Sequence, residues 1–419
     1  MIAPSSTTEE SSPTVSVSSG SDRIGGAARA LALGAALLVG VNLRPAITSV
    51  SALLDQAASS FHLDGAERSL LATLPIIAFG LTAPVGPILA RRLGTARALL
   101  LAMSTLAAAL IARVLADWML LPGTFVVGAA IMMAATLLPP YLKSHQASGL
   151  WIGLSSMSFG VGAALGASLA VPLESILGGT GPALASWVLL TVLAVAALLP
   201  VAPRAGAQGG RAPRLGIGPK ARVTVGLMTA VFSLQALLYF AVTTWLPLML
   251  ASHGADAAEA GWLLAWFSLI GLVPTLVAPV LARRRRILTW FGPGLGLAMA
   301  VGFAWLALDH GSDPLVVTLL GVVQNAGFGL AMGLLVSLAA DEASAGLLSA
   351  LAQGVGYAVA GGGSLILGAM RELTGDWTAS LLLMAACGVA LSACVALAIR
   401  RRPVSLVASA RPTPELLTE

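Results

Sequence analysis

An arginine in the first apolar run of the sequence has the clearest chemical potential. If this run crosses a membrane from Ala30 to Leu54, its midpoint is Asn42 and Arg44 lies just beyond the bilayer centre. A charge at this depth costs roughly 2.5–3.5 kcal/mol on insertion scales, so it requires a specific role. A guanidinium is a planar set of donors that can bind an anionic or strongly polar group of a ligand. The alternative is an arginine that reaches the membrane surface or binds the C-terminal carbonyls of a neighbouring helix.

The residues around Arg44 favour ligand binding. Pro45 predicts a kink that frees backbone carbonyls, and Thr48 lies one turn further along the same helix face as Arg44. All 18 Asp and Glu residues fall in predicted connections or tails, so no intramembrane carboxylate can pair with the guanidinium. Asn42, Arg44 and Thr48 are therefore predicted to bind a ligand in a central cleft, with Pro45 as a hinge.

Other polar side chains occur within later apolar runs. Gln235 and Tyr239 are i, i+4 neighbours in the seventh run. The further candidates are Gln324 and Asn325 in the tenth run, Gln353 and Tyr357 in the eleventh, Arg113 in the third, and Gly361 and Gly362 in the eleventh. Interhelical hydrogen bonding, worth only about 0.6 kcal/mol per contact, is the alternative role for the amides. Arg113 is either a second anion contact or a side chain that snorkels, and the glycines are either a flexible gate or a site of close helix packing.

The composition defines the class of protein that carries these residues. The 419 residues are 57% hydrophobic and only 10% charged, with a mean hydropathy of +0.91. Soluble domains are about 25% charged. At roughly 20 apolar residues per span, the chain holds about 12 transmembrane helices. The predicted fold class is an all-α polytopic membrane protein, with little room for a soluble enzyme domain.

Twelve apolar runs alternate with short connections that contain Gly, Pro or charged residues. The spans are predicted to begin near Ala30, Ser69, Ala98, Leu120, Ser148, Ala183, Val223, Gly261, Ile287, Pro314, Ala345 and Asp376. Alternate connections and the tails hold 19 of the 23 Lys and Arg residues, whereas the opposite connections hold only Arg68 and Arg371. The positive-inside rule therefore predicts a multi-pass protein of the plasma (inner) membrane with both termini cytoplasmic.

The sequence repeats itself at about half its length. Residues 87–92 (Pro-Ile-Leu-Ala-Arg-Arg) match 279–284 (Pro-Val-Leu-Ala-Arg-Arg) at an offset of 192, and five Gly and Leu positions within 149–178 recur at an offset of 197. Chance similarity between apolar segments is the alternative. Parallel six-helix repeats are typical of major facilitator transporters. The predicted organisation is a disordered cytoplasmic tail at 1–22, a six-helix half at 23–202, a cytoplasmic linker at 203–222, a second six-helix half at 223–402 and a cytoplasmic tail at 403–419.

Segments of the first and seventh spans resemble a known family. Residues 42–49 (Asn-Leu-Arg-Pro-Ala-Ile-Thr-Ser), together with 234–239 and 245–247 in the seventh span, resemble the cyanate permease and 2-nitroimidazole transporter family of the major facilitator superfamily. The resemblance covers residues 30–400. It implies a major facilitator fold and secondary transport of small polar or anionic molecules by alternating access. In the loop of residues 86–97 the chain departs from the superfamily, because Arg91 stands where an aspartate is usual.

These observations predict a secondary active or facilitated transporter of a small anionic or polar molecule, acting as a monomer in the lipid bilayer. The alternatives are an exporter of drug-like compounds and a membrane-embedded sensor. The fifth span lacks the Gly-Pro-x-x-Gly-Gly pattern of proton-driven drug exporters, and no soluble signalling domain is evident. No P-loop, His-Glu-x-x-His or Cys-x-x-Cys motif occurs, so no cofactor, metal or nucleic acid is expected. A coupling proton would need a helix-end group such as Asp55, Asp117 or His145.

Overall fold

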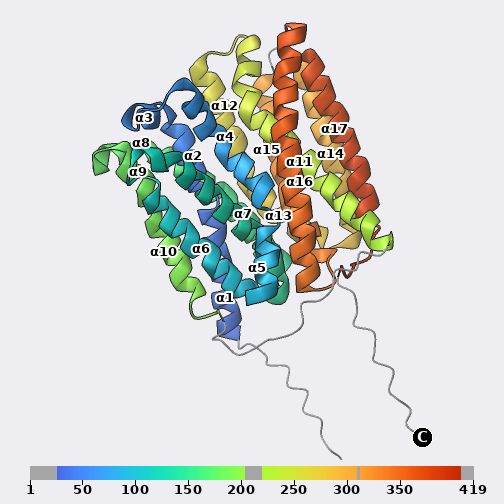
Figure 1. Cartoon of the computed structure of the whole chain (residues 1–419). Coiled ribbons are helices and arrows are strands. Elements are labelled where there is room, and N and C mark those ends of the chain that lie inside the picture. Colours follow the sequence, from blue (N-terminus) through green and yellow to red (C-terminus); the bar gives the residue numbers. More distant parts are fainter. Residues whose placement is uncertain (1–25, 203–218, 309–311, 407–419) are drawn as a thin grey trace, which may run out of the picture.

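The computed structural model describes residues 26–202, 219–308 and 312–406, which form a bundle of helices in two halves (Figure 1). The first half comprises α1 (Gly26–Asn42), α2 (Pro45–Ala52), α3 (Leu54–Ser60), α4 (Gly65–Thr82), α5 (Val85–Leu93), α6 (Thr95–Ala112), the 3₁₀-helix η1 (Asp117–Met119), α7 (Leu120–Ser144), α8 (Gly149–Leu177), α9 (Thr180–Ser186) and α10 (Val188–Leu198). The predicted tail 1–22 and residues 203–218 of the predicted linker lie outside the described residues.

The second half begins at Pro219, within the range predicted as a linker. It comprises α11 (Pro219–Ser252), α12 (Ala257–Ile270), α13 (Leu272–Ala282), α14 (Arg285–Leu308), α15 (Asp313–Ser337), α16 (Glu342–Thr374) and α17 (Thr378–Ala398). In the described part of the chain, the only β contact is an isolated bridge between Ala339 and Val404.

The predicted transmembrane helices are confirmed. The described residues contain 11 helices long and apolar enough to span a membrane, or 12 when α4 and α5, which are bent by 51° relative to each other, count as one span. Each span begins within three residues of its predicted start. Pro84 lies at the bend between α4 and α5, where its missing N–H removes a helical hydrogen bond. The fold is therefore the predicted all-α bundle of two parallel six-helix halves.

The repeat is visible in local structure as well as in sequence. The side chain of Asp64 accepts a hydrogen bond from the Glu67 amide at 2.8 Å and caps α4. In the second half, Asp256 caps α12 in the same way by accepting from the Glu259 amide at 2.8 Å. Both pairs of residues are 192 apart in number, as the sequence repeat requires.

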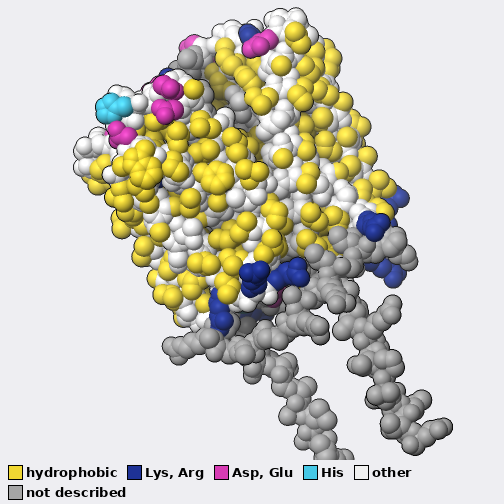
Figure 2. Space-filling view, viewed as in Figure 1, with side chains coloured by type: hydrophobic (Ala, Val, Ile, Leu, Met, Phe, Trp, Pro, Cys, Tyr) yellow, Lys and Arg dark blue, Asp and Glu magenta, His cyan; other side chains and the backbone are white. Residues whose placement is uncertain are grey.

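Charged residues gather at opposite ends of the bundle (Figure 2). We define the basic end by Arg91 and Arg92 in the last turn of α5, Lys143 in the last turn of α7, and residues 283–286, which run from the end of α13 into the start of α14. The opposite, acidic end is defined by Asp55, Asp64, Glu67, Asp117, Asp256 and Glu259. Figure 2 also shows a furrow between the two halves toward the acidic end.

The two halves pack closely where α8 meets α13. A Cβ atom at Gly153 would lie 2.1 Å from the carbonyl oxygen of Leu276, and one at Gly149 would lie 2.9 Å from that of Pro279. Only glycine permits this approach of the two backbones. Because Gly149 begins α8 beside Lys143 and Ala147, this tight contact lies at the basic end.

The chain after α17 is bound to the basic end. The Val404 amide donates to the Leu338 carbonyl at 2.9 Å, and Ala340 donates back to Val404 at 3.0 Å. Leu406 is completely buried, and its amide donates to the Ser344 hydroxyl at 2.8 Å. Residues 403–406, which the sequence places in a tail, therefore join the connection between α15 and α16.

Candidate functional site

The first span is broken next to the predicted binding arginine. Helix α1 ends at Asn42 and α2 begins at Pro45, with Arg44 between them at φ −124° and ψ −38°. Proline has no N–H, so the carbonyl of Val41 loses its usual helical donor. Helix α8 approaches closely here: a Cβ at Gly162 would lie 2.0 Å from the Val41 oxygen. The break is held by this contact, and it directs Arg44 away from the regular helix.

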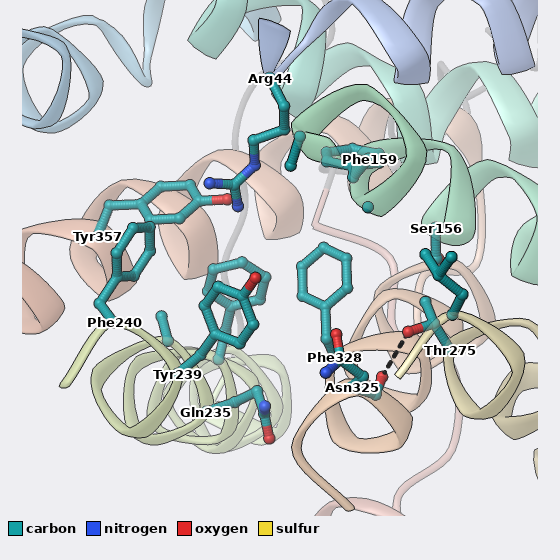
Figure 3. A pocket seen from close by; sticks show the side chains of 15 residues that line it. Arg44, Ser156, Phe159, Gln235, Tyr239, Phe240, Thr275, Asn325, Phe328 and Tyr357 are labelled. Atoms are coloured by element: carbon teal, nitrogen blue, oxygen red, sulfur yellow. Dashed lines mark hydrogen bonds between the residues drawn. The ribbon is translucent and has the colours of Figure 1, made fainter. Parts of the chain in front are cut away.

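Arg44 extends into a cavity between the two halves (Figure 3). The cavity is lined by Arg44, Ser156, Phe159, Gly160 and Ala163 of the first half, and by Phe232, Gln235, Ala236, Tyr239, Phe240, Leu272, Thr275, Asn325, Phe328 and Tyr357 of the second. The non-atom space among these residues is about 590 Å³, including the part open toward solvent.

The guanidinium of Arg44 faces aromatic rings rather than carboxylates. Its central carbon lies 5.7 Å from the centre of the Phe240 ring, within the range of a cation–π contact. Figure 3 shows it next to the hydroxyl of Tyr357. Among the described residues that line the cavity, Arg44 is the one basic side chain and none is acidic. The N–H donors of Arg44 are therefore not occupied by an ion pair in the described residues.

Aromatic side chains form most of the walls around Arg44. Tyr357 packs against Phe240 with ring centres 5.9 Å apart, and Tyr239 packs against Phe240 at 5.8 Å. Phe159 of the first half meets Phe328 of the second at 5.7 Å, in an edge-to-face arrangement. These rings present flat apolar surfaces to the cavity beside the guanidinium.

The polar side chains that α13 and α15 contribute to the cavity, Thr275 and Asn325, donate hydrogen bonds to backbone carbonyl groups. Thr275 donates to the carbonyls of Gly271, at 2.8 Å, and Asn325, at 3.1 Å (Figure 3). The Asn325 side-chain amide donates to the Gly321 carbonyl at 2.9 Å. This leaves the carbonyl oxygen of the Asn325 side chain as an acceptor at the cavity.

The structure brings only some of the predicted site residues together. Arg44, Gln235, Tyr239, Asn325 and Tyr357 line the cavity. Of these, Gln235 directs its amide toward α15, where Nε2 donates to the Gln324 carbonyl at 2.8 Å. Its stem, rather than its amide, faces the cavity.

Four of the predicted residues lie outside the cavity lining and bind other helices. Asn42 is buried against α10, where it accepts from Thr191 at 2.8 Å and donates to Leu190. Thr48 donates to the Arg44 carbonyl at 3.1 Å. The buried Gln324 side chain contacts the Leu238 carbonyl, and Gln353 donates to Ala135 and Ser349. These bonds engage the amide N–H groups of Asn42, Gln324 and Gln353 inside the bundle, which is the role that the hydrogen-bonding alternative gives them, while Oε1 of Gln324 is buried without a hydrogen-bond partner.

The predicted hinge and gate residues have different local structures. Pro45 begins α2 at the observed break. In contrast, α16 continues without interruption from Glu342 to Thr374, through Gly361 and Gly362. A Cβ at Gly361 would lie 3.2 Å from the Ile76 side chain, so this glycine serves close packing against α4.

Arg113 neither snorkels nor lines the cavity. Its side chain is completely buried, and it donates to the carbonyls of Ala46, at 3.2 Å, and Leu184, at 2.9 Å. It thus joins the end of α6 to α2 and α9. Because Ala46 lies directly after Pro45, Arg113 supports the break from which Arg44 extends.

The four phenylalanines of the cavity were missed in the sequence, whereas Tyr239 and Tyr357 were among the predicted site residues. Aromatic side chains are only 5% of the chain, with 10 Phe and 3 Tyr. Four of these phenylalanines and two of the tyrosines line this one cavity. The available signal was the position of Phe159, Phe232, Phe240 and Phe328 within apolar runs whose other residues are mostly aliphatic.

Comparison with known proteins identifies the fold family. Residues 31–364 match the family described as Major Facilitator Superfamily. The chain belongs to this superfamily. It is therefore a multi-pass membrane transporter of small solutes, and not an enzyme.

Relatives and solved structures agree with this assignment. The 2-nitroimidazole transporter of Escherichia coli (strain K12) is 29% identical over 86% of this chain and 93% of its own length. The cyanate transport protein CynX of the same strain is 28% identical over 85% and 94%, and the uncharacterized transporter YycB of Bacillus subtilis (strain 168) is 28% identical over 85% and 90%. The proton:xylose symporter XylE has a TM-score of 0.70 at 15% identity, covering 88% of this chain and 95% of its own. FucP in its outward conformation has a TM-score of 0.66 at 14% identity, covering 87% and 98%.

Proposed function

We propose that this transporter carries a small planar molecule with an anionic or electron-rich oxygen pair, such as a carboxylate or nitro group. Arg44 binds the oxygens. The observation that carries the proposal is the position of Arg44, a cation between aromatic walls with no acidic side chain among the described residues of the cavity lining.

The matching geometry of the guanidinium and of a planar oxygen pair on the ligand supports this substrate class. A guanidinium presents two parallel N–H donors, which match the planar oxygen pair of a carboxylate or nitro group. A cation without a counterion in an apolar cavity favours an anion over a neutral or cationic ligand. The rings of Phe240 and Tyr239 then contact the flat body of the molecule, and Tyr357 adds a hydroxyl group beside the guanidinium.

The relatives add independent support. One of them is named for 2-nitroimidazole and another for cyanate, both small molecules. 2-Nitroimidazole also combines a planar ring with a planar pair of oxygens. We therefore propose for this chain a substrate of the planar, oxygen-paired kind that 2-nitroimidazole represents, without assigning one compound.

Transport follows from the cavity's position between the halves. The tight contact of Gly149 and Gly153 with α13 closes the basic end, and the furrow lies toward the acidic end. The distribution of basic residues supports a cytoplasmic basic end, so we assign an outward-facing state in the plasma membrane. Rocking of the halves about the cavity would then expose Arg44 to the cytoplasm.

A binding and uptake panel tests the proposal. Purified full-length protein in liposomes would be offered benzoate, 2-nitroimidazole, cyanate and, as an aromatic cation, benzylammonium. We expect saturable uptake of benzoate or 2-nitroimidazole and none of benzylammonium, whereas cyanate, a linear anion with one oxygen, tests whether charge alone is enough. Preferential uptake of benzylammonium or of bulky lipophilic cations would contradict the proposal and favour a drug exporter.

A matched arginine provides the control for the site. Arg371, at the acidic end, also stacks on an aromatic ring, with its central carbon 5.8 Å from the Trp377 ring, but it lies outside the cavity. Arg44→Lys keeps the charge and loses the paired donors, so affinity should fall by about tenfold or more. Arg371→Lys should leave affinity unchanged. Equal effects of the two substitutions would show that Arg44 does not bind the substrate.

A further inference from the structure

Six arginines lie together at the basic end of the second half. Residues 284–286 are at the start of α14, and residues 400–402 follow the end of α17. We call these six residues the arginine patch. Five of them are exposed, and Arg401 is half-buried. Figure 2 shows basic side chains along the basic end, including the right-hand side, where the second half lies.

The packing of α14 against α17 brings the two arginine runs together. A Cβ atom at Gly292 would lie 2.9 Å from the Val395 side chain, and one at Gly296 would lie 2.5 Å from the amide nitrogen of Ser392. The numbers fall along one helix as they rise along the other, so the helices are antiparallel. The same register, continued toward the basic end, sets residue 286 beside residue 401.

The arginine patch has no counterion among the described residues. None of its guanidinium groups forms an ion pair with a described carboxylate. Asp341, which accepts from the Ser405 hydroxyl at 3.1 Å, is the acidic side chain bound to the segment after α17. It caps α16 by accepting from the Ser344 amide at 2.8 Å. Like charges in one place repel each other, so an anion bound to the patch would stabilise both helix ends.

The equivalent positions of the first half are far less basic. Helices α14 and α17 are the third and sixth spans of their half, and α6 and α10 are those of the first. Residues 92–94, before α6, and residues 200–202, after α10, contain a single arginine, Arg92. A topology signal requires basic residues at this end of the bundle, but not six at one pair of helices. The excess in the second half therefore indicates a ligand.

The surface beside the patch is suited to a membrane lipid. Trp290 is 67% exposed and lies one turn beyond Arg286. The same face of α14 continues through the exposed Leu297 and Val301, and α17 adds the exposed Leu397. Tryptophan is enriched at the boundary between membrane and water. One continuous surface thus offers cations to a headgroup and apolar side chains to acyl chains.

We propose that the arginine patch binds the headgroup of an anionic phospholipid from the leaflet at the basic end, with the acyl chains against α14 and α17. Guanidinium groups form paired, charge-assisted hydrogen bonds with phosphate oxygens, and clusters of basic residues at a membrane surface are typical of anionic-lipid recognition. A zwitterionic phospholipid brings its own cation and gains less from the patch. A free phosphate lacks the acyl chains. The lipid site is separate from the substrate cavity and does not depend on the proposed substrate.

Lipid binding is tested on the purified full-length protein in a neutral detergent. Phosphatidylglycerol, phosphatidylcholine and inorganic phosphate are added separately, and bound lipid is counted by native mass spectrometry while the unfolding temperature is recorded. We expect phosphatidylglycerol to bind and to raise the unfolding temperature with its concentration, because a ligand of the folded state stabilises that state. Equal stabilisation by phosphatidylcholine would overturn the proposal. Equal stabilisation by inorganic phosphate would also overturn it, since the patch would then be a simple anion site.

Matched removals of charge locate the site. Arg286→Gln combined with Arg401→Gln should lower the affinity for phosphatidylglycerol by about tenfold or more. Arg92→Gln combined with Lys143→Gln removes the same charge from the basic end of the first half and should leave this affinity unchanged. Each pair joins one exposed and one half-buried residue. Equal losses in the two variants would overturn the proposal, because attraction to any basic surface would then explain the binding.

Trp290 reports where the lipid lies. Bromine atoms on an acyl chain quench tryptophan fluorescence on contact, so brominated phosphatidylglycerol and brominated phosphatidylcholine are compared at the same small share of a nanodisc bilayer. We expect stronger quenching by phosphatidylglycerol, and Trp290→Phe should remove this excess. Trp262→Phe, at an exposed tryptophan of α12 toward the acidic end, should retain it. An excess that survives Trp290→Phe would overturn the position of the lipid beside α14.

Discussion

The guanidinium carbon of Arg44 lies 5.7 Å from the centre of the Phe240 ring, so a cation of one half faces a π surface of the other. The two side chains come from α11 and from the break between α1 and α2, which belong to different halves. Any rocking motion that separates the halves must change this contact. A ligand bound between them can therefore stabilise one arrangement of the halves over another.

The first prediction concerns this contact. Phe240→Leu keeps an apolar side chain but removes the ring face, and a partly buried cation–π contact is worth about 1–2 kcal/mol. We expect substrate affinity to fall by about 5- to 30-fold, measured by binding to the purified protein. Phe291→Leu, a change in α14 outside the cavity lining, is the control. Unchanged affinity in the Phe240 variant would show that the ring does not contribute to the site.

A second prediction follows from the burial of Arg113. Arg113→Ala leaves the carbonyls of Ala46 and Leu184 without this donor and opens a cavity, so we expect a loss of at least about 2 kcal/mol in stability. The measurement is thermal unfolding in detergent. Arg371→Ala, an exposed arginine, should change stability by less than about 0.5 kcal/mol. Comparable unfolding temperatures for both variants would contradict the structural role of Arg113.

The helices were predictable because the length of an apolar run, and the position of a charge within it, can be read directly from the sequence. Runs of about 20 apolar residues had to be helices, and Arg44 stood out because a charge near a bilayer centre is costly. The direction of each side chain was harder to predict. Asn42 is two residues from Arg44, about 200° around a helix, so it faces α10 rather than the cavity.

Adjacent amides illustrate the same limit. Gln324 and Asn325 follow each other in α15, about 100° apart around the helix, and only Asn325 lines the cavity. The composition of the run cannot show which of the two amides faces the cavity. That depends on how α15 is rotated about its axis against α11 and α13. The contact between Gln353 and Ala135 also joins residues 218 apart, which no local pattern reveals.

A third prediction concerns the bound segment after α17. Deleting residues 403–419 removes the completely buried Leu406 and its backbone bonds to the basic end. Burial of a leucine contributes about 1.5–3 kcal/mol, so the unfolding temperature should fall measurably. Deleting only 407–419 keeps Val404 and Leu406 and should have little effect. If both deletions lower the unfolding temperature equally, residues 403–406 do not stabilise the basic end.

The last prediction concerns the hydrogen bond that Gln353 makes across the two halves. Its Nε2 donates to the Ala135 carbonyl of α7 at 3.2 Å, and α16 belongs to the other half, so this bond must break if the basic end opens. Gln353→Leu removes the bond at nearly constant volume and should shift the equilibrium toward the open basic end by about 0.5–1.5 kcal/mol, or 2- to 13-fold. The readout is the thiol-labelling rate of a cysteine at the half-buried Ala147, beside the contact between the halves at the basic end, in a background with Cys387 and Cys394 replaced by Ser. Gln324→Leu is the matched control, because the buried amide of Gln324 bonds within one half and its loss should leave the labelling rate unchanged. A labelling rate for Gln353→Leu equal to that of the wild type would mean that this bond does not hold the two halves together.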